Sequence, residues 1–475
     1  MGIRYMSYND FIQKKLKISH YHGFEVDKKD IHKTLFNYQK DLTLWALKKG
    51  KACLFTGTGT GKTFMELEFA RQVNLKTGKK SIIVAPLAVS EQIRKEAHDK
   101  MGLDIYNIRR NTGNYKSDIH IINYESISKI DPADYIDCIF DESSILKNLD
   151  GKRRNELIEM FIDYSYKLCC SATPSPNDFM ELGNHCQHLN VMSYNEMLAM
   201  YFTHDGSDTT KWRLKKQGIK RFWEFLSTWA AFMNEPSDLG YDFNFNLPEL
   251  HIDIIKVKEE YKNENKFFLV DVDVSKMSLN DRRKARKNSL SAKVEWIKNY
   301  IDNHKDNIFC IWCDLNKESE ELHKNINESI EVKGSDKLEI KEKNLLAFSE
   351  GKIKELITKP KIAGHGMNWQ ICHNVFFCGL SDSFEQFFQA IRRFWRYGQL
   401  HNVNVFIVVC DSENITIENI QRKERDHNKM YSEMVLHTKK YIIDDIRGNK
   451  DHASSYKPNI NMIIPEWLRS YTDVS

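Results

Sequence analysis

The chain has 475 residues, of which 41% are hydrophobic and 29% are charged, and its formal net charge is +4 at pH 7. These values are typical of a soluble globular protein with two or three domains, and no apolar run reaches the roughly 20 residues of a membrane-spanning helix. The N-terminus is polar and basic rather than signal-like, and the cysteines are scattered, so we expect a cytoplasmic protein with reduced thiols. The small positive charge permits a polyanionic partner without requiring one.

Residues 1–35 show no strong periodicity, and we interpret them as an N-terminal extension. A helical stretch follows and continues to about Lys49. Gln39 lies in this stretch, a short distance before a glycine-rich segment. Its amide could recognise the edge of adenine, because an amide both donates and accepts hydrogen bonds. A glutamine on the surface of a helix is an equally good explanation of this residue alone.

The glycine-rich segment, residues 57–63, lies between a strand-like apolar run at 52–55 and a stretch with helical apolar spacing at 64–70. This order predicts a phosphate-binding loop that surrounds phosphate oxygens with backbone N–H groups and a helix N-terminus. Lys62 would reach the outer phosphates of ATP, and the Thr63 hydroxyl would bind Mg²⁺. The alternative, a glycine-rich turn with an incidental lysine, does not explain the flanking pattern. The expected nucleotide-binding residues here are Gln39, Gly57, Thr58, Gly59, Thr60, Gly61, Lys62 and Thr63.

Apolar runs then alternate with helical segments, which predicts a parallel sheet with ligands at the carboxyl ends of its strands. The third of these runs ends in Asp141 and Glu142. We expect Asp141 to hold Mg²⁺ and Glu142 to polarise the attacking water, because packing does not explain an acidic pair after a buried strand. Ser171 and Thr173, after the fourth run, could relay hydrogen bonds to a second domain. The four runs are 81–86, 120–125, 135–140 and 166–170.

Aromatic residues crowd into residues 191–249 at spacings near three and four, which predicts a small helical insertion with most rings in its core. Its basic run at 211–216, with Lys220 and Arg221, either contacts nucleic-acid phosphates or forms a solvated face. Just before it, the sequence from His185 to His188 is interpreted as a helix surface rather than a metal site, because no second ligand pair of matching spacing lies nearby.

A second alternating series begins near residue 250 and has no glycine loop of its own, so we expect a domain that completes the site of the first. A basic segment at 281–287 is a helix candidate within it. Gly366, in the segment 358–370 that follows a strand, suits a close approach to phosphate or ribose. The expected strands are 251–255, 307–312, 330–332, 355–358, 375–378 and 403–409.

The segment 389–399 begins with Gln389, which we add with Gly366 to the expected nucleotide-binding residues. It places Arg393 and Arg396 three positions apart, hence on one face of a helix. Brought toward a γ-phosphate by the second domain, these side chains could act as arginine fingers. A basic surface helix is the alternative, against which the neighbouring aromatic residues argue.

Together these segments resemble the ordered motifs of superfamily two helicases of the Swi/Snf-like branch, in the compact form encoded by bacteriophages and prophages. The resemblance covers roughly residues 35–425. Motif II reads Asp-Glu-Ser-Ser at 141–144, a departure from the usual Asp-Glu-Ala-Asp or Asp-Glu-Ala-His. Motif VI at 389–399 resembles the Swi/Snf branch rather than RNA helicases. The adenine-reading motif and motifs I, Ia, Ib, III and V match 38–39, 57–63, 85–86, 123–125, 171–173 and 358–370.

The resemblance implies an α/β protein with two RecA-like parallel-sheet domains in tandem, at 36–190 and 250–445, the helical insertion between them and a tail at 446–475. ATP with Mg²⁺ and DNA, duplex by preference, would each bind across the cleft. Hydrolysis would alternately close and open that cleft and move the protein along DNA, with or without strand separation. The residues expected to act in catalysis are Lys62, Glu142, Arg393 and Arg396.

Phage or host replication proteins are further expected partners, no membrane is expected, the oligomeric state is left open, and the expected location is the cytoplasm of a bacterial host. Two alternatives remain for the activity. One is a nucleotide-dependent clamp that holds nucleic acid without cycling, against which the intact catalytic residues argue. The other is an RNA helicase, which only the form of the motifs disfavours.

Overall fold

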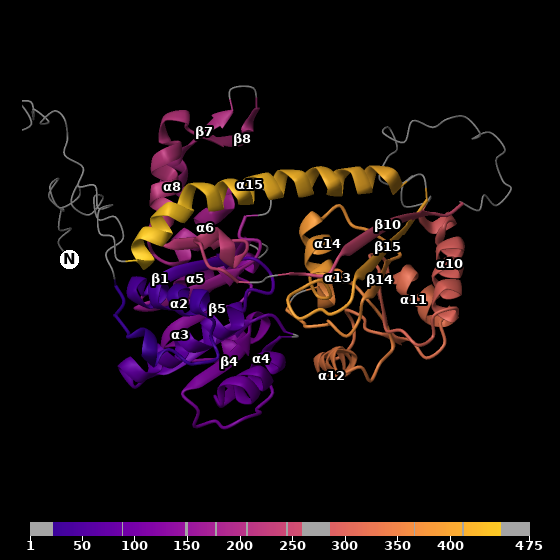
Figure 1. The fold of residues 1–475 in the computed structure, drawn as a ribbon, viewed down its shortest axis with the longest axis horizontal. Coiled ribbons are helices and arrows are strands. Elements are labelled where there is room, and N and C mark those ends of the chain that lie inside the picture. The colour runs from indigo at the N-terminus through magenta and orange to yellow at the C-terminus, as the bar shows by residue number, and fades with distance from the viewer. Residues whose placement is uncertain are drawn as a thin grey trace, which may run out of the picture.

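The computed structural model describes residues 22–87, 89–147, 151–175, 178–205, 208–243, 246–258, 286–364, 366–410 and 413–447. The described chain forms two domains, each built on a parallel sheet with helices around it (Figure 1). The strand order is β3-β4-β2-β5-β6-β1-β9 in the first sheet and β10-β15-β14-β11-β13-β12 in the second. This architecture confirms the predicted pair of RecA-like α/β domains.

The elements have the following bounds. The first sheet consists of β1 (Lys51–Thr56), β2 (Lys80–Ala85), β3 (Ile105–Asn107), β4 (Ile119–Asn123), β5 (Tyr135–Phe140), β6 (Tyr166–Ser171) and β9 (Ala230–Met233). The second consists of β10 (Leu250–Lys256), β11 (Phe309–Trp312), β12 (Ile330–Glu331), β13 (Glu355–Thr358), β14 (Asn374–Phe377) and β15 (Val403–Val409). The helices up to the second domain are α2 (Asn37–Lys49), α3 (Lys62–Thr77), α4 (Ser90–Glu96), α5 (Gly151–Met160), α6 (Leu182–His188), α7 (Tyr194–Tyr201) and α8 (Ile219–Ser227). Those that follow are α10 (Leu290–Asp302), α11 (Asn316–Asn325), α12 (Leu338–Ser349), α13 (Pro360–Ala363), α14 (Phe384–Ile391) and α15 (Asn414–Ile446).

The strands of the first sheet are buried on both faces. In β1, Ala52 and Leu54 belong to one hydrophobic core, and Cys53 and Phe55 belong to a second core on the other side of the sheet. Alternate residues of a strand point to opposite faces, so a strand covered on both sides needs apolar residues at nearly every position. This is why most of these strands could be recognised as short continuous apolar runs.

Residues 191–249 do not form a purely helical insertion. They contain α7 and α8, but also an antiparallel hairpin of β7 (Phe202–Asp205) and β8 (Asp208–Leu214), which includes most of the basic run. Strand β9 pairs in parallel with β1 and forms the edge of the first sheet. The prediction missed β9 because a four-residue apolar strand shows no periodicity that separates it from a helix.

The described part of the predicted N-terminal extension packs onto the first domain. The backbone N–H groups of His22 and Phe24 donate to carbonyl groups at the end of α2. Ile31 and Leu35 are each 3% exposed and belong to the core beside α2 and α3. Residues 1–21, most of the basic segment at 281–287 and nearly all of the tail at 446–475 lie outside the described residues.

Helix α15 connects the two domains and runs along both of them in Figure 1. Ile417 and Ile420 near its start belong to a core of the second domain, whereas Met434 and Ile442 belong to the two cores of the first. Tyr431 Oη donates to the carbonyl of Phe55 over 2.8 Å, next to the start of the glycine-rich loop. The last helix of the predicted second domain therefore also stabilises the first. Among the described helices, none is long and apolar enough to cross a membrane.

Candidate active site

The predicted phosphate-binding loop joins β1 to α3, in the order that the sequence indicates. Gly59 and Gly61 have φ angles of +82° and +78°, in the left-handed region that favours glycine. Gly57 lies against another backbone, because a Cβ added to it would lie 2.2 Å from the carbonyl oxygen of Asn234. The loop therefore requires glycine at all three positions.

Lys62 begins α3 and points back into the loop. Its Nζ donates to the carbonyl oxygens of Thr56 at 2.9 Å and Gly57 at 3.0 Å. Burial lowers the pKa of Lys62, and the carboxylates of Glu142 and Asp141 oppose this shift. The lysine therefore lies between the loop and the acidic pair, where it can bind a phosphate oxygen.

Gln39 lies directly against the loop. Its Nε2 donates to the carbonyl of Thr60 over 2.9 Å, and its Oε1 accepts from the backbone N–H of Phe36 over 2.8 Å. A Cβ on Gly61 would lie 2.2 Å from this Nε2. Tyr38 Oη also donates to the Thr60 carbonyl, over 3.0 Å. Gln39 thus supports the loop in this structure, and its contact with adenine stays a prediction.

The acidic pair follows β5 and is almost buried, with Asp141 9% and Glu142 8% exposed. Glu142 has a φ angle of +52°. Positive φ angles are uncommon in residues with a side chain, and residues that have them are concentrated at functional sites. Its Oε1 accepts hydrogen bonds from Ser144 Oγ at 2.6 Å and Ser171 Oγ at 2.8 Å. The departure of motif II from the common form therefore supplies a donor that orients Glu142.

The charges at this site fit a magnesium ion. Burial and the neighbouring Glu142 raise the pKa of Asp141, and Lys62 and Arg393 oppose this shift. A third buried carboxyl, that of Glu66 on α3, interacts electrostatically with this pair, and burial and the charge of Asp141 raise its pKa. Clustered carboxylates repel one another, and Mg²⁺ prefers oxygen ligands. Asp141 and the Thr63 hydroxyl would hold the ion, as the sequence predicts.

Helix α14 brings a second set of polar groups from the other domain. Gln389 Nε2 donates to Thr173 Oγ1 over 3.1 Å, and Lys147 Nζ lies 2.7 Å from Glu385 Oε2. The backbone N–H of Thr173 in turn donates to Ser171 Oγ over 3.0 Å. Hydrogen bonds therefore connect Glu142, through Ser171 and Thr173, to Gln389. The predicted relay between the domains is confirmed in its contacts.

Arg393 and Arg396 lie in the turn after α14, which ends at Ile391 and is shorter than the predicted helix. Burial and the neighbouring Arg396 lower the pKa of Arg393 to about 9, and Glu142 and Asp141 oppose this shift. Burial also lowers the pKa of Arg396, against the opposing charges of Glu96 and Asp141. Arg393 is 4% exposed. The structure thus places Arg393 close enough to Asp141 and Glu142, and Arg396 close enough to Asp141, to interact electrostatically.

Gly366 of the second domain packs against the first domain. It has a φ angle of +78°, and a Cβ added to it would lie 1.8 Å from Val89 Cγ2 in the first domain. Nearby, Asn368 Nδ2 donates to Glu96 Oε1 over 2.7 Å. Close packing between the domains therefore explains the glycine, and its contact with a nucleotide stays a prediction.

Two family models match the chain. The model described as type III restriction enzyme, res subunit, matches residues 24–176, and the helicase conserved C-terminal domain matches residues 292–398. This pair of domains indicates a superfamily two helicase-type protein. It also implies an ATP-hydrolysing enzyme and the use of a nucleotide. No curated protein matches the chain.

Sequence reasoning missed several polar residues of this helicase-type protein. Glu385 precedes Gln389 by four positions, and this spacing on one helical face could have revealed it. No spacing in the sequence points to Lys147.

His185 on α6 lies against the motif II turn, with its Nε2 3.0 Å from Ser143 Oγ. Helix α6, including His185 and His188, is therefore buried, and its interpretation as a helix surface is wrong.

The basic residues of the insertion are partly engaged within the protein. Lys215 Nζ donates to the carbonyls of Ala199 at 2.6 Å and Met200 at 3.2 Å, at the end of α7. Lys220 lies 3.9 Å from Glu224 in an exposed ion pair, a kind that contributes little to stability. A role of this run in binding nucleic acid stays a prediction.

Proposed function

We propose that this helicase-type protein hydrolyses ATP in the cleft between its domains and uses the cycle to move along or remodel duplex DNA. The observation that carries the proposal is the connection from Glu142 through Ser171 and Thr173 to Gln389. It joins the residue suited to activate water with the domain that must close over the nucleotide. A nucleotide-binding domain that acted alone would have no need of this contact.

In the proposed reaction, the phosphates of ATP lie against the loop 57–61 and Lys62. Glu142 takes a proton from the attacking water, whose oxygen forms a bond to the γ-phosphorus while the bond to the β–γ bridging oxygen breaks. Bound magnesium, held by Thr63 and Asp141, would neutralise charge on the β- and γ-phosphates. Ser144 and Ser171 fix the orientation of the Glu142 carboxylate.

The second domain contributes two arginines that would stabilise the negative charge of the transferring phosphoryl group. Arg393 and Arg396 belong to a domain without a phosphate-binding loop, so they can reach the γ-phosphate only while the cleft is closed. Their electrostatic interaction with Asp141 in this structure supports that arrangement. Guanidinium groups in this position stabilise the transferring phosphoryl group. Gln389 and Gly366 are proposed to contact the nucleotide from the same domain.

Duplex DNA is the proposed partner because the form of motif VI favours the Swi/Snf-like branch over RNA helicases. The resemblance of the motifs to the phage and prophage forms of this branch favours such an origin, with a function in DNA replication or recombination. Contacts with phosphates rather than bases would make binding salt-sensitive and nearly independent of sequence.

The test is one ATPase assay with duplex DNA, single-stranded DNA and RNA as separate stimulants. We expect the strongest stimulation by duplex DNA. Stimulation by RNA alone would show an RNA helicase instead. Nucleotide-dependent binding of DNA without turnover would show a clamp and contradict the proposed motor.

A further inference from the structure

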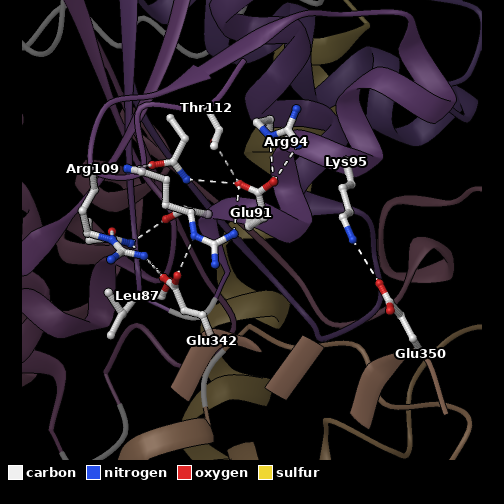
Figure 2. Close-up of polar contacts among 12 residues, drawn as sticks. Leu87, Glu91, Arg94, Lys95, Arg109, Thr112, Glu342 and Glu350 are labelled. Atoms are coloured by element: carbon white, nitrogen blue, oxygen red, sulfur yellow. Dashed lines mark hydrogen bonds and ion pairs between the residues drawn. The ribbon is translucent and has the colours of Figure 1, made fainter. Parts of the chain in front are cut away.

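Two arginines outside the nucleotide site converge on one carboxylate of the other domain (Figure 2). Arg109 and Arg110 follow β3 in the first domain, and Glu342 lies on α12 of the second. Arg109 Nη2 donates to Glu342 Oε1, and Arg110 Nε lies 2.7 Å from Glu342 Oε2. The side chains of Arg109 and Glu342 are 5% and 4% exposed. The carboxylate is therefore held by two guanidinium groups in a nearly buried position.

The arginine pair lies where a parallel α/β sheet presents its ligands. Arg109 Nε donates to Asn123 Oδ1 over 2.8 Å, and Asn123 Nδ2 donates to Ser90 Oγ over 2.5 Å. Asn123 ends β4, and Ser90 begins the helix after β2, so these bonds connect the carboxyl ends of β3, β4 and β2. These strands are neighbours in the sheet. Ligands bind at this edge of open parallel sheets.

Glu342 supplies one of the two carboxylates that offset the positive charge of this cluster, and it does so only while the domains are in contact. Glu91 on α4 lies 2.6 Å from Arg94 Nη2 and 3.8 Å from Arg110 Nη1. Three arginines thus face two carboxylates, those of Glu91 and Glu342, and removing Glu342 would leave three facing one. Within the described residues, Glu342 is the carboxylate paired with Arg109. A buried guanidinium that loses its partner requires another anion or water.

We propose that Arg109 and Arg110 form a binding site for a backbone phosphate of nucleic acid, which Glu342 occupies in this arrangement of the domains. A guanidinium binds a carboxylate and a phosphate with the same fork of donors. The phosphate displaces Glu342 and releases α12 from the first domain. The inference rests on the proposed function, because it assigns the phosphodiester backbone to a particular pair of residues.

Binding of a fluorescein-labelled duplex of mixed sequence to the full chain, followed by anisotropy at several salt concentrations, tests the proposal. Glu342→Gln removes the competing charge and keeps the side-chain shape, so we expect binding about fivefold tighter or more. Glu350→Gln is the matched control. Glu350 also pairs across the domains, at 3.0 Å from Lys95, but these side chains are 39% and 46% exposed. We expect less than a ~2-fold effect, because exposed pairs contribute little.

Two further variants separate a phosphate site from an ordinary bridge between domains. Arg109→Gln should weaken binding and reduce the salt slope by about one, as expected for one lost phosphate contact. The double variant Arg109→Glu with Glu342→Arg exchanges the two charges. It restores an ion pair but not the phosphate site, so its affinity for the duplex should stay below that of the wild type. If the exchanged pair restores the affinity of the wild type, Arg109 and Glu342 form a structural bridge and the proposal is wrong. If Glu342→Gln and Glu350→Gln change the affinity for the duplex equally, the proposal is also wrong.

The binding results also distinguish failure of this site from failure of the proposed function. If neither the wild type nor Glu342→Gln binds duplex DNA, single-stranded DNA or RNA, nucleic acid is not the partner, and the phosphate site is wrong together with the proposed function. If the wild type binds normally and Arg109→Gln binds equally well with the same salt slope, only the assignment of this site is wrong.

Discussion

Gln389 of the second domain donates a hydrogen bond to Thr173 of the first over 3.1 Å, and both side chains are buried. Thr173 donates through its backbone N–H to Ser171, whose hydroxyl donates to Glu142. A change in the position of the second domain therefore alters the hydrogen bonds of the residue proposed to activate water. This relationship gives a physical reason for hydrolysis to depend on closure of the cleft.

Loss of the contact between the domains should uncouple hydrolysis from nucleic acid. We expect Gln389→Ala to lower the nucleic-acid-stimulated ATPase rate by about tenfold, because a closed-cleft contact worth about 1.4 kcal/mol is lost. The control is Gln386→Ala on the same helix, whose side chain accepts from Ser381 within its own domain. Full stimulation of Gln389→Ala would show that the contact has no function in coupling.

The assignment of the hydrolytic residues predicts two different defects. Glu142→Gln should still bind ATP but hydrolyse it at least ~10²-fold more slowly, because a positioned base is lost. Lys62→Ala should lose affinity for the nucleotide as well. Titration with a fluorescent ATP analogue and single-turnover hydrolysis separate the two effects. Turnover at the wild-type rate by Glu142→Gln would contradict the assignment.

The arginines after α14 should act on hydrolysis rather than on binding. We expect Arg393→Ala or Arg396→Ala to retain most binding of DNA and ATP and to lose DNA-stimulated hydrolysis by on the order of 10³-fold. Arg392→Ala is the matched control, because that guanidinium stacks on the rings of Trp395 and Phe388.

Steady-state ATPase and DNA-binding assays on the three variants distinguish the outcomes. A variant of Arg393 or Arg396 that loses DNA binding but keeps its basal hydrolysis would show contacts to DNA phosphates instead. Full stimulated activity in both variants would make the closed-cleft mechanism wrong.

The buried carboxyl of Asp137 in β5 should make stability depend on pH. Burial raises its pKa to about 8, whereas an unfolded chain has an aspartate pKa near ~3.9. The folded state therefore binds the proton more tightly, so this contribution to stability is present at low pH and is lost as pH rises from about 4 to about 8, by at most ~1.4 kcal/mol per unit.

Asp137→Asn mimics the protonated carboxyl and should flatten this dependence, so that the variant gains stability relative to the wild type at pH 8 compared with pH 5. Urea midpoints at the two pH values give the measurement, with the exposed Asp302→Asn as the control for net charge. An unchanged pH dependence in Asp137→Asn would contradict the prediction.

The sequence by itself determined most strands of the two sheets and the core of the nucleotide site. β15 lies at Val403–Val409, where its apolar run predicts it, and the glycine loop lies between β1 and α3. These features depend on requirements that act within short segments of the chain. A strand buried on both faces is apolar throughout, and a loop around phosphate needs glycine. The order of such segments also predicts that Asp141 and Glu142 follow a strand at the ligand-binding edge of the sheet.

Only the tertiary structure decided which distant groups meet. Strand β9 has four residues and no readable period, yet pairing with β1 makes it the edge of the first sheet. Tyr431 reaches the Phe55 carbonyl because α15 continues from the second domain across the first. Arg109 and Glu342 are 233 positions apart, and no sequence spacing relates them. Such contacts join segments that are far apart in the chain, and neither partner carries a local pattern that reveals the other.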